Sequence, residues 1–200
     1  MHFVLTSVPR LFLIFMFTDP ETFKYNEFLL KSQPVFLEEF ESFGLKKKFH
    51  PWAMTKDAKE PLHNGGWTVR VLFGLSRMLK NSDKDYPKIC SLIKGLDHMF
   101  GAGFSVLKAG EKIKAHKGYG MDKPVIRVHL PLILPKQSRE GVIVPNEDCW
   151  IRVGGEFKVW RYNELLMFDD LQEHEVQNNT KEDRCIMIFD FYKEAFEGMV

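Results

Sequence analysis

The 200-residue sequence predicts a mainly β protein of the α+β class: a β-sandwich or jelly roll behind an α-helical N-terminal layer. Three observations predict it. Apolar residues recur at helical spacing in the first part of the chain, short apolar runs replace them from about residue 102, and turn-forming residues separate these runs. Many short strands behind a few leading helices are typical of a closed, two-layered β fold.

The helical part of the prediction rests on two segments. Residues 19–21 (Asp-Pro-Glu) have the form of a helix start, with an acid that can cap the first turn followed by proline and glutamate. Aromatic and leucine side chains continue at helical spacing through residues 36–43, and Gly44 is a suitable end. A second, shorter helix is expected within residues 86–96, where isoleucines and leucines share one face.

The β part of the prediction rests on short apolar runs between turn signals. Pairs such as Gly154-Gly155 and Asn178-Asn179 favour turns rather than regular structure. The expected strands cover residues 102–108, 125–134, 150–153, 157–161, 165–168, 173–177 and 184–192.

The chain is expected to divide into an apolar N-terminal segment, residues 1–18, and a single domain, residues 19–200. The longest clean apolar run, residues 11–17, is far shorter than the roughly 20 residues that cross a bilayer. It also lacks the basic start and small-residue cleavage site of a signal peptide. We interpret it as a strand or a segment that docks on the core; contact with a membrane surface is the alternative.

Composition restricts the partners and the compartment. The formal net charge of +1 gives no support for a nucleic-acid partner. The three cysteines, Cys90, Cys149 and Cys185, are odd in number and widely spaced, so neither a disulfide framework nor a zinc site is indicated. We therefore expect a cytoplasmic protein.

Polar residues that interrupt apolar strands are the first candidates for function, because burying them unpaired is costly. Side chains alternate between the two faces of a strand, so Arg127 and His129 share one face while their apolar neighbours take the other. A cation beside an imidazole suggests a bound anion, although a solvent-exposed sheet face explains the same pattern. Arg184 opens the last apolar strand, ten positions after His174, and could place a carboxylate clamp near a metal ligand.

His116 and His174 fall on separate segments of the β region. Two histidines from separate strands form the protein half of the facial non-haem iron site, which keeps positions open for substrate and oxygen. That site usually adds an acid two residues after the first histidine, but Gly118 stands there. From spacing alone, the missing acid counts against a complete triad.

Several motifs, in order along the chain, give residues 19–192 a close resemblance to the aspartyl/asparaginyl β-hydroxylase family of iron(II)/2-oxoglutarate oxygenases. The interval between His174 and Arg184 fits the family too. The matching segments are 104–107 (Phe-Ser-Val-Leu), 110–118 (Gly-Glu-Lys-Ile-Lys-Ala-His-Lys-Gly), 127–132 (Arg-Val-His-Leu-Pro-Leu), 168–176 (Phe-Asp-Asp-Leu-Gln-Glu-His-Glu-Val) and 184–190 (Arg-Cys-Ile-Met-Ile-Phe-Asp).

The resemblance implies a double-stranded β-helix, the cupin-like jelly roll, and a site in which glycine replaces the triad acid and water fills the vacant position. It implies that the metal ligands and catalytic residues are His116 and His174. The residues it implies for binding 2-oxoglutarate are Ser105, Arg127, His129 and Arg184. The acids around the second histidine could orient that ligand or could be solvated turn residues; they are Asp169, Asp170 and Glu175.

The function implied is that of an Fe(II)/2-oxoglutarate-dependent dioxygenase that hydroxylates an aspartyl/asparaginyl-type, peptidyl or related small-molecule substrate. Fe(II), 2-oxoglutarate and O2 would be required, and succinate and CO2 released. The alternatives are a lipid acyl-chain hydroxylase of the lipid A type with the same mechanism, and a non-catalytic cupin-like binding protein. This chain departs from the family pattern in lacking a proline soon after His116, in Gln177 and in an extra segment at residues 136–147, all of which concern the substrate side.

Overall fold

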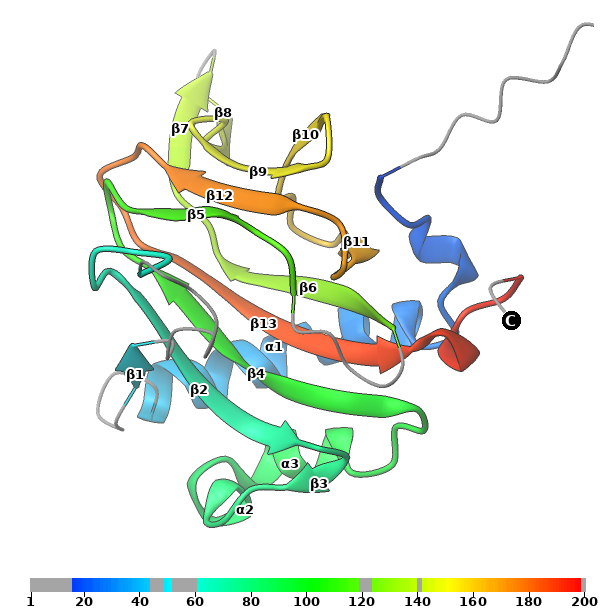
Figure 1. The fold of residues 1–200 in the computed structure, drawn as a ribbon. Coiled ribbons are helices and arrows are strands. Elements are labelled where there is room, and N and C mark those ends of the chain that lie inside the picture. The colour runs from blue at the N-terminus through cyan, green and yellow to red at the C-terminus, as the bar shows by residue number, and fades with distance from the viewer. Residues whose placement is uncertain (1–15, 44–48, 52–60, 119–123, 140–141, 199–200) are drawn as a thin grey trace, which may run out of the picture.

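Two antiparallel β-sheets face each other, and helices cover the outer side of the larger one (Figure 1). The computed structural model describes residues 16–43, 49–51, 61–118, 124–139 and 142–198. In the described residues the larger sheet has the order β1-β2-β4-β13-β6-β11, with β3 paired to β2, and the smaller sheet has the order β10-β9-β12-β5. This arrangement of two facing antiparallel sheets confirms the mainly β, jelly-roll class that the sequence predicts.

The strands of the larger sheet are β1 (His50–Pro51), β2 (Trp67–Gly74), β3 (Arg77–Met78), β4 (Met99–Leu107), β6 (Val125–Ile133), β11 (Leu166–Asp169) and β13 (Arg184–Tyr192). The strands of the smaller sheet are β5 (Lys112–His116), β9 (Cys149–Val153), β10 (Glu156–Val159) and β12 (His174–Asn178). A separate hairpin is formed by β7 (Lys136–Arg139) and β8 (Val142–Pro145). The helices are η1 (Pro20–Thr22), α1 (Asn26–Phe43), α2 (Ser82–Asp85), α3 (Pro87–Ile93) and η3 (Lys193–Ala195).

The expected strands are all present, with bounds that differ by at most three residues, and β13 has the bounds predicted. The extra segment at residues 136–147 contains the β7–β8 hairpin. Strands β2 and β5 were not predicted as strands. In β2 the polar Thr68 and Arg70 interrupt the apolar pattern, and in β5 three of the five residues are lysine or histidine.

The expected helix from residue 19 is wrong in its first part. Asp19 does act as a cap, since its side chain accepts from the Glu21 backbone N–H at 3.0 Å, but only a 3-10 turn follows. The chain then becomes extended at Phe23, whose buried ring stacks on Phe196 with centroids 4.8 Å apart. Burying Phe23 between other aromatic rings interrupts the helix, which resumes at α1.

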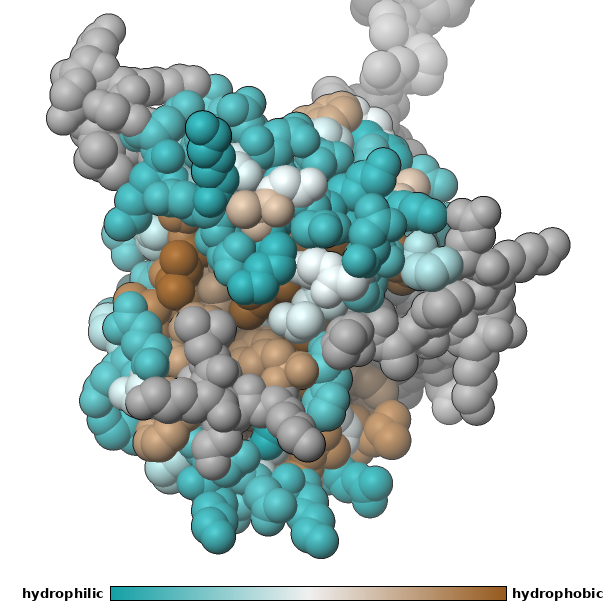
Figure 2. Space-filling view, turned by 90° about the vertical axis from the view of Figure 1, so that its left-hand side faces the viewer, coloured by the Kyte–Doolittle hydropathy of each residue, from teal (hydrophilic) through white to brown (hydrophobic). Residues whose placement is uncertain are grey.

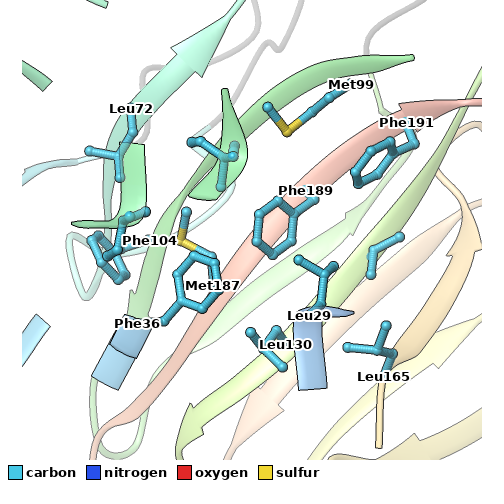
Figure 3. Packing of buried hydrophobic residues seen from close by; sticks show 14 of the residues in the cluster. Leu29, Phe36, Leu72, Met99, Phe104, Leu130, Leu165, Met187, Phe189 and Phe191 are labelled. Carbon is cyan, nitrogen blue, oxygen red and sulfur yellow. The ribbon is translucent and has the colours of Figure 1, made fainter. Parts of the chain in front are cut away.

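Helix α1 packs against the larger sheet through a stripe of buried side chains that includes Leu29, Phe36 and Phe40. Spacings of seven and four residues place them on one helical face. In Figure 3, Leu29 and Phe36 point at Leu130 of β6 and Phe189 of β13. Each such buried side chain contributes roughly 1.5–3 kcal/mol, so this layer is a main source of stability.

Strand β13 is buried on both faces, and its two faces differ in chemistry. Cys185, Met187, Phe189 and Phe191 belong to the core under the helices. The alternate residues face the other sheet, and these are Arg184, Ile186, Ile188 and Asp190. Strand β6 repeats the pattern: Arg127 and His129 share one face, as predicted, and that face is turned to the smaller sheet. The space between the sheets therefore receives every charged side chain of these two central strands.

The last residues of the N-terminal segment extend the edge of the larger sheet. Phe17 forms a β-bridge with Phe168 and is buried, and the Thr18 N–H donates to the Met167 carbonyl at 2.8 Å. Residues 17 and 18 thus pack on the core, while residues 1–15 lie outside the described part of the chain. Within the described ranges, no helix has the length and apolar character needed to span a membrane.

One face of the molecule is polar above and below and apolar in the middle. Figure 2 shows this face, with hydrophobic residues reaching the surface between two hydrophilic areas. Apolar residues therefore reach the surface on this face, between its two hydrophilic areas.

Helices α1 and α3 are joined by a buried carboxylate. Glu39 of α1 accepts from the backbone N–H groups of Lys88 and Ile89, both at 2.9 Å, and so satisfies the first turn of α3. We expect Glu39→Ala to lower the free energy of unfolding by about 1–3 kcal/mol, because one buried and one part-buried N–H group lose their acceptor. The neighbouring Glu38→Ala is the matched control, since Glu38 only pairs with Lys88 at the surface. Equal effects of the two substitutions in urea unfolding would contradict this assignment.

Candidate active site

Antiparallel pairing of β5 and β12 brings the two predicted metal ligands together. His116 is the last residue of β5, His174 is the first of β12, and the two are directly opposite in the register. Their ring centroids lie 4.2 Å apart with the planes tilted by 54°. The pairing is irregular just after His174, where the register shifts before Val176. Two imidazoles therefore meet at one end of the inter-sheet space.

The hydrogen bonds of these rings assign their protons. His116 Nδ1 lies 2.8 Å from the Lys114 carbonyl oxygen, and His174 Nδ1 lies 2.8 Å from the Gln172 carbonyl oxygen. A carbonyl only accepts, so each Nδ1 carries the hydrogen and each Nε2 keeps a lone pair. Burial lowers the pKa of both rings, that of His174 to about 3, with further lowering from neighbouring charges. Both imidazoles are thus neutral at pH 7 and suited to bind a metal through Nε2.

The space of the missing triad acid is filled by Asp170. A Cβ built on Gly118 would lie 1.7 Å from Asp170 Oδ2, and the Gly118 N–H donates to the Asp170 carbonyl at 2.7 Å. Asp170 Oδ1 is 3.7 Å from His174 Nε2. Among the described residues, no group of three or more His, Cys, Asp or Glu side chains is arranged to hold a metal ion. Asp170 therefore replaces the acid in space without joining the histidines as a third ligand in this geometry.

Arg127 is held by two carboxylates. Its Nε and Nη2 donate to the two oxygens of Asp190 at 2.9 and 3.2 Å, and its Nη1 lies 2.7 Å from Asp170 Oδ1. Burial raises the pKa of Asp170 to about 6, although Arg127 opposes the shift. Asp170 Oδ2 is buried and has no hydrogen-bond partner among the described residues. The positive charge of Arg127 is thus neutralised by acids at the end of the inter-sheet space where the two histidines lie.

Arg184 is different, because it is a buried cation with no acid paired to it in the described part of the chain. It is 1% exposed, and in the part of the chain that the structure describes no carboxylate pairs with it and its Nε lacks a hydrogen-bond partner. Its guanidinium lies 5.0 Å from the centroid of the Trp160 ring. Burial lowers the pKa of the guanidinium, yet an arginine stays charged in proteins. A buried charge of this kind is costly unless an anion binds beside it.

Two indole groups orient the remaining candidates. The Trp67 Nε1–H donates to Ser105 Oγ at 2.9 Å, and the Trp160 Nε1–H donates to His129 Nδ1 at 3.2 Å. Burial, followed by the charges of Arg184 and Arg127, lowers the pKa of His129 well below its usual range. His129 is therefore neutral, with its proton on Nε2.

All six predicted site residues line one pocket between the sheets, together with Trp67 and a set of apolar side chains. The apolar lining residues are Ile113, Ile151, Phe168, Val176, Ile186 and Ile188. A narrow apolar pocket with a few convergent polar groups is the usual form of a small-molecule site.

Of the three acids considered as partners of His174, only Asp170 comes near its ring. Asp169 pairs with Lys193, while Glu175 binds Arg152 at 2.7 Å on the outer face of the smaller sheet. Arg152 also contacts Glu173, so it holds the backbone on both sides of the histidine. Glu173 and Glu175 therefore stabilise the segment on either side of His174 and do not contact its ring.

The sequence reasoning assigned no role to Trp67, Trp160 or Asp190. Asp190 could have been found, because it shares the period-two face of Arg184 on a strand whose bounds were predicted. Trp67 lies on β2, which was not predicted, and Trp160 follows β10, where nothing in the sequence indicates which way the indole points.

The fold and the site define a jelly-roll protein with a paired-histidine candidate metal centre and a cationic pocket behind it. A model of the aspartyl/asparaginyl beta-hydroxylase family matches residues 31–194, so the chain belongs to this family. The resemblance seen in the sequence motifs is thereby confirmed.

Curated relatives agree with this family, and a solved structure shares the fold. The chain is 28% identical over 177 residues to the ornithine lipid ester-linked acyl 2-hydroxylase of Rhizobium tropici, covering 88% of this chain and 59% of that one. It is 29% identical over 133 residues to the human aspartyl/asparaginyl beta-hydroxylase, covering 64% of this chain but 16% of that protein. A Trichoplax adhaerens prolyl hydroxylase in complex with a peptide fragment shares the fold, with a TM-score of 0.52 at 14% identity over 82% of this chain and 80% of that one.

Restoring an acid at position 118 should fail. A side chain there would meet both the carboxylate and the backbone oxygen of Asp170, so we expect Gly118→Asp to destabilise the fold by about 1–3 kcal/mol and not to strengthen iron binding. Gly155→Asp is the control, because nothing lies within 4 Å of a Cβ at that glycine. Urea unfolding and iron titration measure both effects. A stable Gly118→Asp protein with tighter iron binding would contradict the prediction.

The metal-free protein should lose stability on acidification because of His174. The unfolded chain takes up a proton near pH 6.5, whereas the folded chain resists protonation until about pH 3. Stability from this residue is therefore present above pH 6.5 and lost as the pH falls towards 3, by up to about 1.4 kcal/mol per unit. Asp170, whose pKa is raised, acts in the opposite sense but is common to both proteins compared. Urea unfolding between pH 7 and 4 should show a shallower loss in His174→Leu; parallel curves would contradict it.

Proposed function

We propose that this protein is an Fe(II)/2-oxoglutarate-dependent dioxygenase that hydroxylates an aspartyl/asparaginyl-type, peptidyl or related small-molecule substrate. The observation that carries the proposal is that one pocket combines two features. These are two neutral histidines with Nε2 lone pairs, and a buried arginine that has no carboxylate partner among the described residues. A small dicarboxylate that also coordinates a metal would match both features, because it would bind the metal held by the histidines and pair with the arginine.

The residues at the histidine end fit ferrous iron. Neutral imidazoles suit Fe(II), and a site with two protein ligands leaves positions open for other groups. Asp170 Oδ2, which has no hydrogen-bond partner among the described residues, could accept a hydrogen bond from a water molecule at one of these open positions. Bound iron would supply the activation of O2 that is coupled to conversion of 2-oxoglutarate into succinate and CO2.

The residues at the other end fit a carboxylate. Arg184 supplies the charge, and a neutral His129 with a hydrogen on Nε2 supplies a second donor. The Ser105 hydroxyl accepts from Trp67, which leaves its own hydrogen to donate. We propose that these three hold 2-oxoglutarate, and that Arg127 contributes from the metal end, where it fixes Asp170, rather than as the main source of charge.

The substrate has two candidate classes. The family supports an aspartyl/asparaginyl-type substrate. The lipid hydroxylase from R. tropici, however, aligns with 177 residues of this chain against 133 for the human enzyme, which favours an ester-linked acyl chain as the second candidate. A non-catalytic binding protein is the third reading, and the presence of all six site residues around one pocket argues against it.

We also propose a cytoplasmic location and one domain over residues 19–200. All three cysteines are free and buried, as expected of thiols in a reducing compartment. Neither proposal affects the chemistry of the site.

Anaerobic titration of the protein with Fe(II) and 2-oxoglutarate tests the function, followed by measurement of succinate after O2 is admitted. We expect Arg184→Gln to weaken 2-oxoglutarate binding by roughly 10- to 100-fold while iron is retained, because a charge-assisted contact is lost. Arg161→Gln, at an exposed position, is the matched control. We expect His174→Ala to abolish iron binding.

Substrate class is read from the same assay. Succinate formation is compared with an Asp/Asn-containing peptide and with an ester-linked acyl lipid, each against no substrate. Failure of the iron-loaded protein to bind 2-oxoglutarate would overturn the proposed function as a whole. Stimulation by the lipid alone would replace the first substrate class by the second.

A further inference from the structure

Trp160 touches two of the residues assigned to the co-substrate without lining the pocket itself. It follows β10, is 2% exposed and belongs to the apolar cluster between the sheets. Its ring nitrogen meets His129 and its ring face meets Arg184, which come from the neighbouring strands β6 and β13 of the larger sheet. One side chain that follows the smaller sheet thus contacts both donors.

The contact with His129 fixes a proton. An indole nitrogen can only donate, so the Trp160 Nε1–H at 3.2 Å requires a lone pair on His129 Nδ1. The hydrogen of a neutral imidazole must then be on Nε2. Phe168 packs edge-on against the same ring at 5.4 Å between centroids, which limits its rotation. His129 is therefore held as a donor towards the pocket rather than as an acceptor that would repel an anion.

The contact with Arg184 keeps a charge available. An aromatic face attracts a guanidinium but takes none of its N–H donors, in contrast to a carboxylate, which consumes donors and neutralises the charge. Arg127 on the adjacent strand illustrates the second case, with Asp190 and Asp170 bound to it. Arg184, 5.0 Å from the Trp160 ring centroid, illustrates the first. The difference decides which of the two arginines can receive an anionic ligand.

We propose that Trp160 is a positioning residue for the dicarboxylate co-substrate, because it presents the His129 Nε2–H and the Arg184 guanidinium together to one carboxylate group. The inference rests on the proposed function for the identity of the ligand, but the assignment of the His129 proton stands on the geometry of the protein alone. Trp160 acts through these two residues, since neither its nitrogen nor its ring faces the ligand space.

Substitutions at Trp160 separate its two contacts. Trp160→Phe keeps an aromatic face under Arg184 and removes the N–H donor, so that His129 is free to exchange its proton between the two nitrogens. Trp160→Leu removes both contacts. Trp150→Phe is the matched control, because Trp150 packs against Phe157 on β9 and β10, away from the pocket lining.

Two measurements test the proposal. Nitrogen-15 NMR of the histidine rings in the metal-free protein should show an unprotonated Nδ1 for His129 in the wild type and a mixture of the two tautomers in Trp160→Phe. Anaerobic titration with Fe(II) should then show 2-oxoglutarate binding weakened roughly 10- to 100-fold in Trp160→Phe and further in Trp160→Leu, with iron binding and Trp150→Phe unchanged.

The two proposals fail in different ways. A protonated Nδ1 on His129 in the wild type overturns the role of Trp160 whether or not any variant folds. Normal 2-oxoglutarate binding in a folded Trp160→Phe protein also overturns it and leaves the proposed function intact. If the wild type binds no 2-oxoglutarate although the tautomer responds as expected, the proposed function falls, and the co-substrate role of Trp160 falls with it.

Discussion

The guanidinium of Arg184 is the group on which the rest of the pocket depends. A fully buried cation costs several kcal/mol unless something compensates it, and here no described acid does so. The Trp160 ring compensates part of this cost through the attraction between a cation and an aromatic face. The part of this cost that the ring does not compensate favours the binding of an anion in the pocket. The apolar side chains around it exclude water and strengthen that attraction.

At the opposite end of the pocket, the two histidine rings stay neutral. Both metal-binding candidates donate Nδ1–H to carbonyl oxygens two residues earlier, so the backbone orients each ring and leaves Nε2 as the ligand atom without help from another side chain. Asp170 lies beside them in the space of the absent acid, held by Arg127 and through it by Asp190. Arg184 and the paired histidines thus lie at different ends of one pocket. This arrangement suits a ligand that coordinates a metal at one end and carries a carboxylate at the other.

Much of the fold could be predicted because it depends on periodicity. The alternation along β6 assigned Arg127 and His129 to one face, and the last strand was placed with its observed bounds. Strand β2 could not be predicted, because polar residues interrupt its apolar pattern. The break in the helix at Phe23 could not be predicted either, because it depends on the ring of Phe196, near the other end of the sequence. The residues of the candidate site could be predicted from the sequence motifs, but the ion-pair partner of each charged side chain could not.

By itself, the sequence determined the class of fold, the faces of the central strands and the identity of the six candidate site residues. Only the tertiary structure decided that, within the described ranges, two acids bind Arg127 and none binds Arg184. It also decided that Asp170 fills the place beside Gly118 and that Trp160 contacts both His129 and Arg184. The reason is physical: strand periodicity is a local property of neighbouring residues, whereas the partner of a buried charge comes from another strand, and no spacing along the chain records which strand that is.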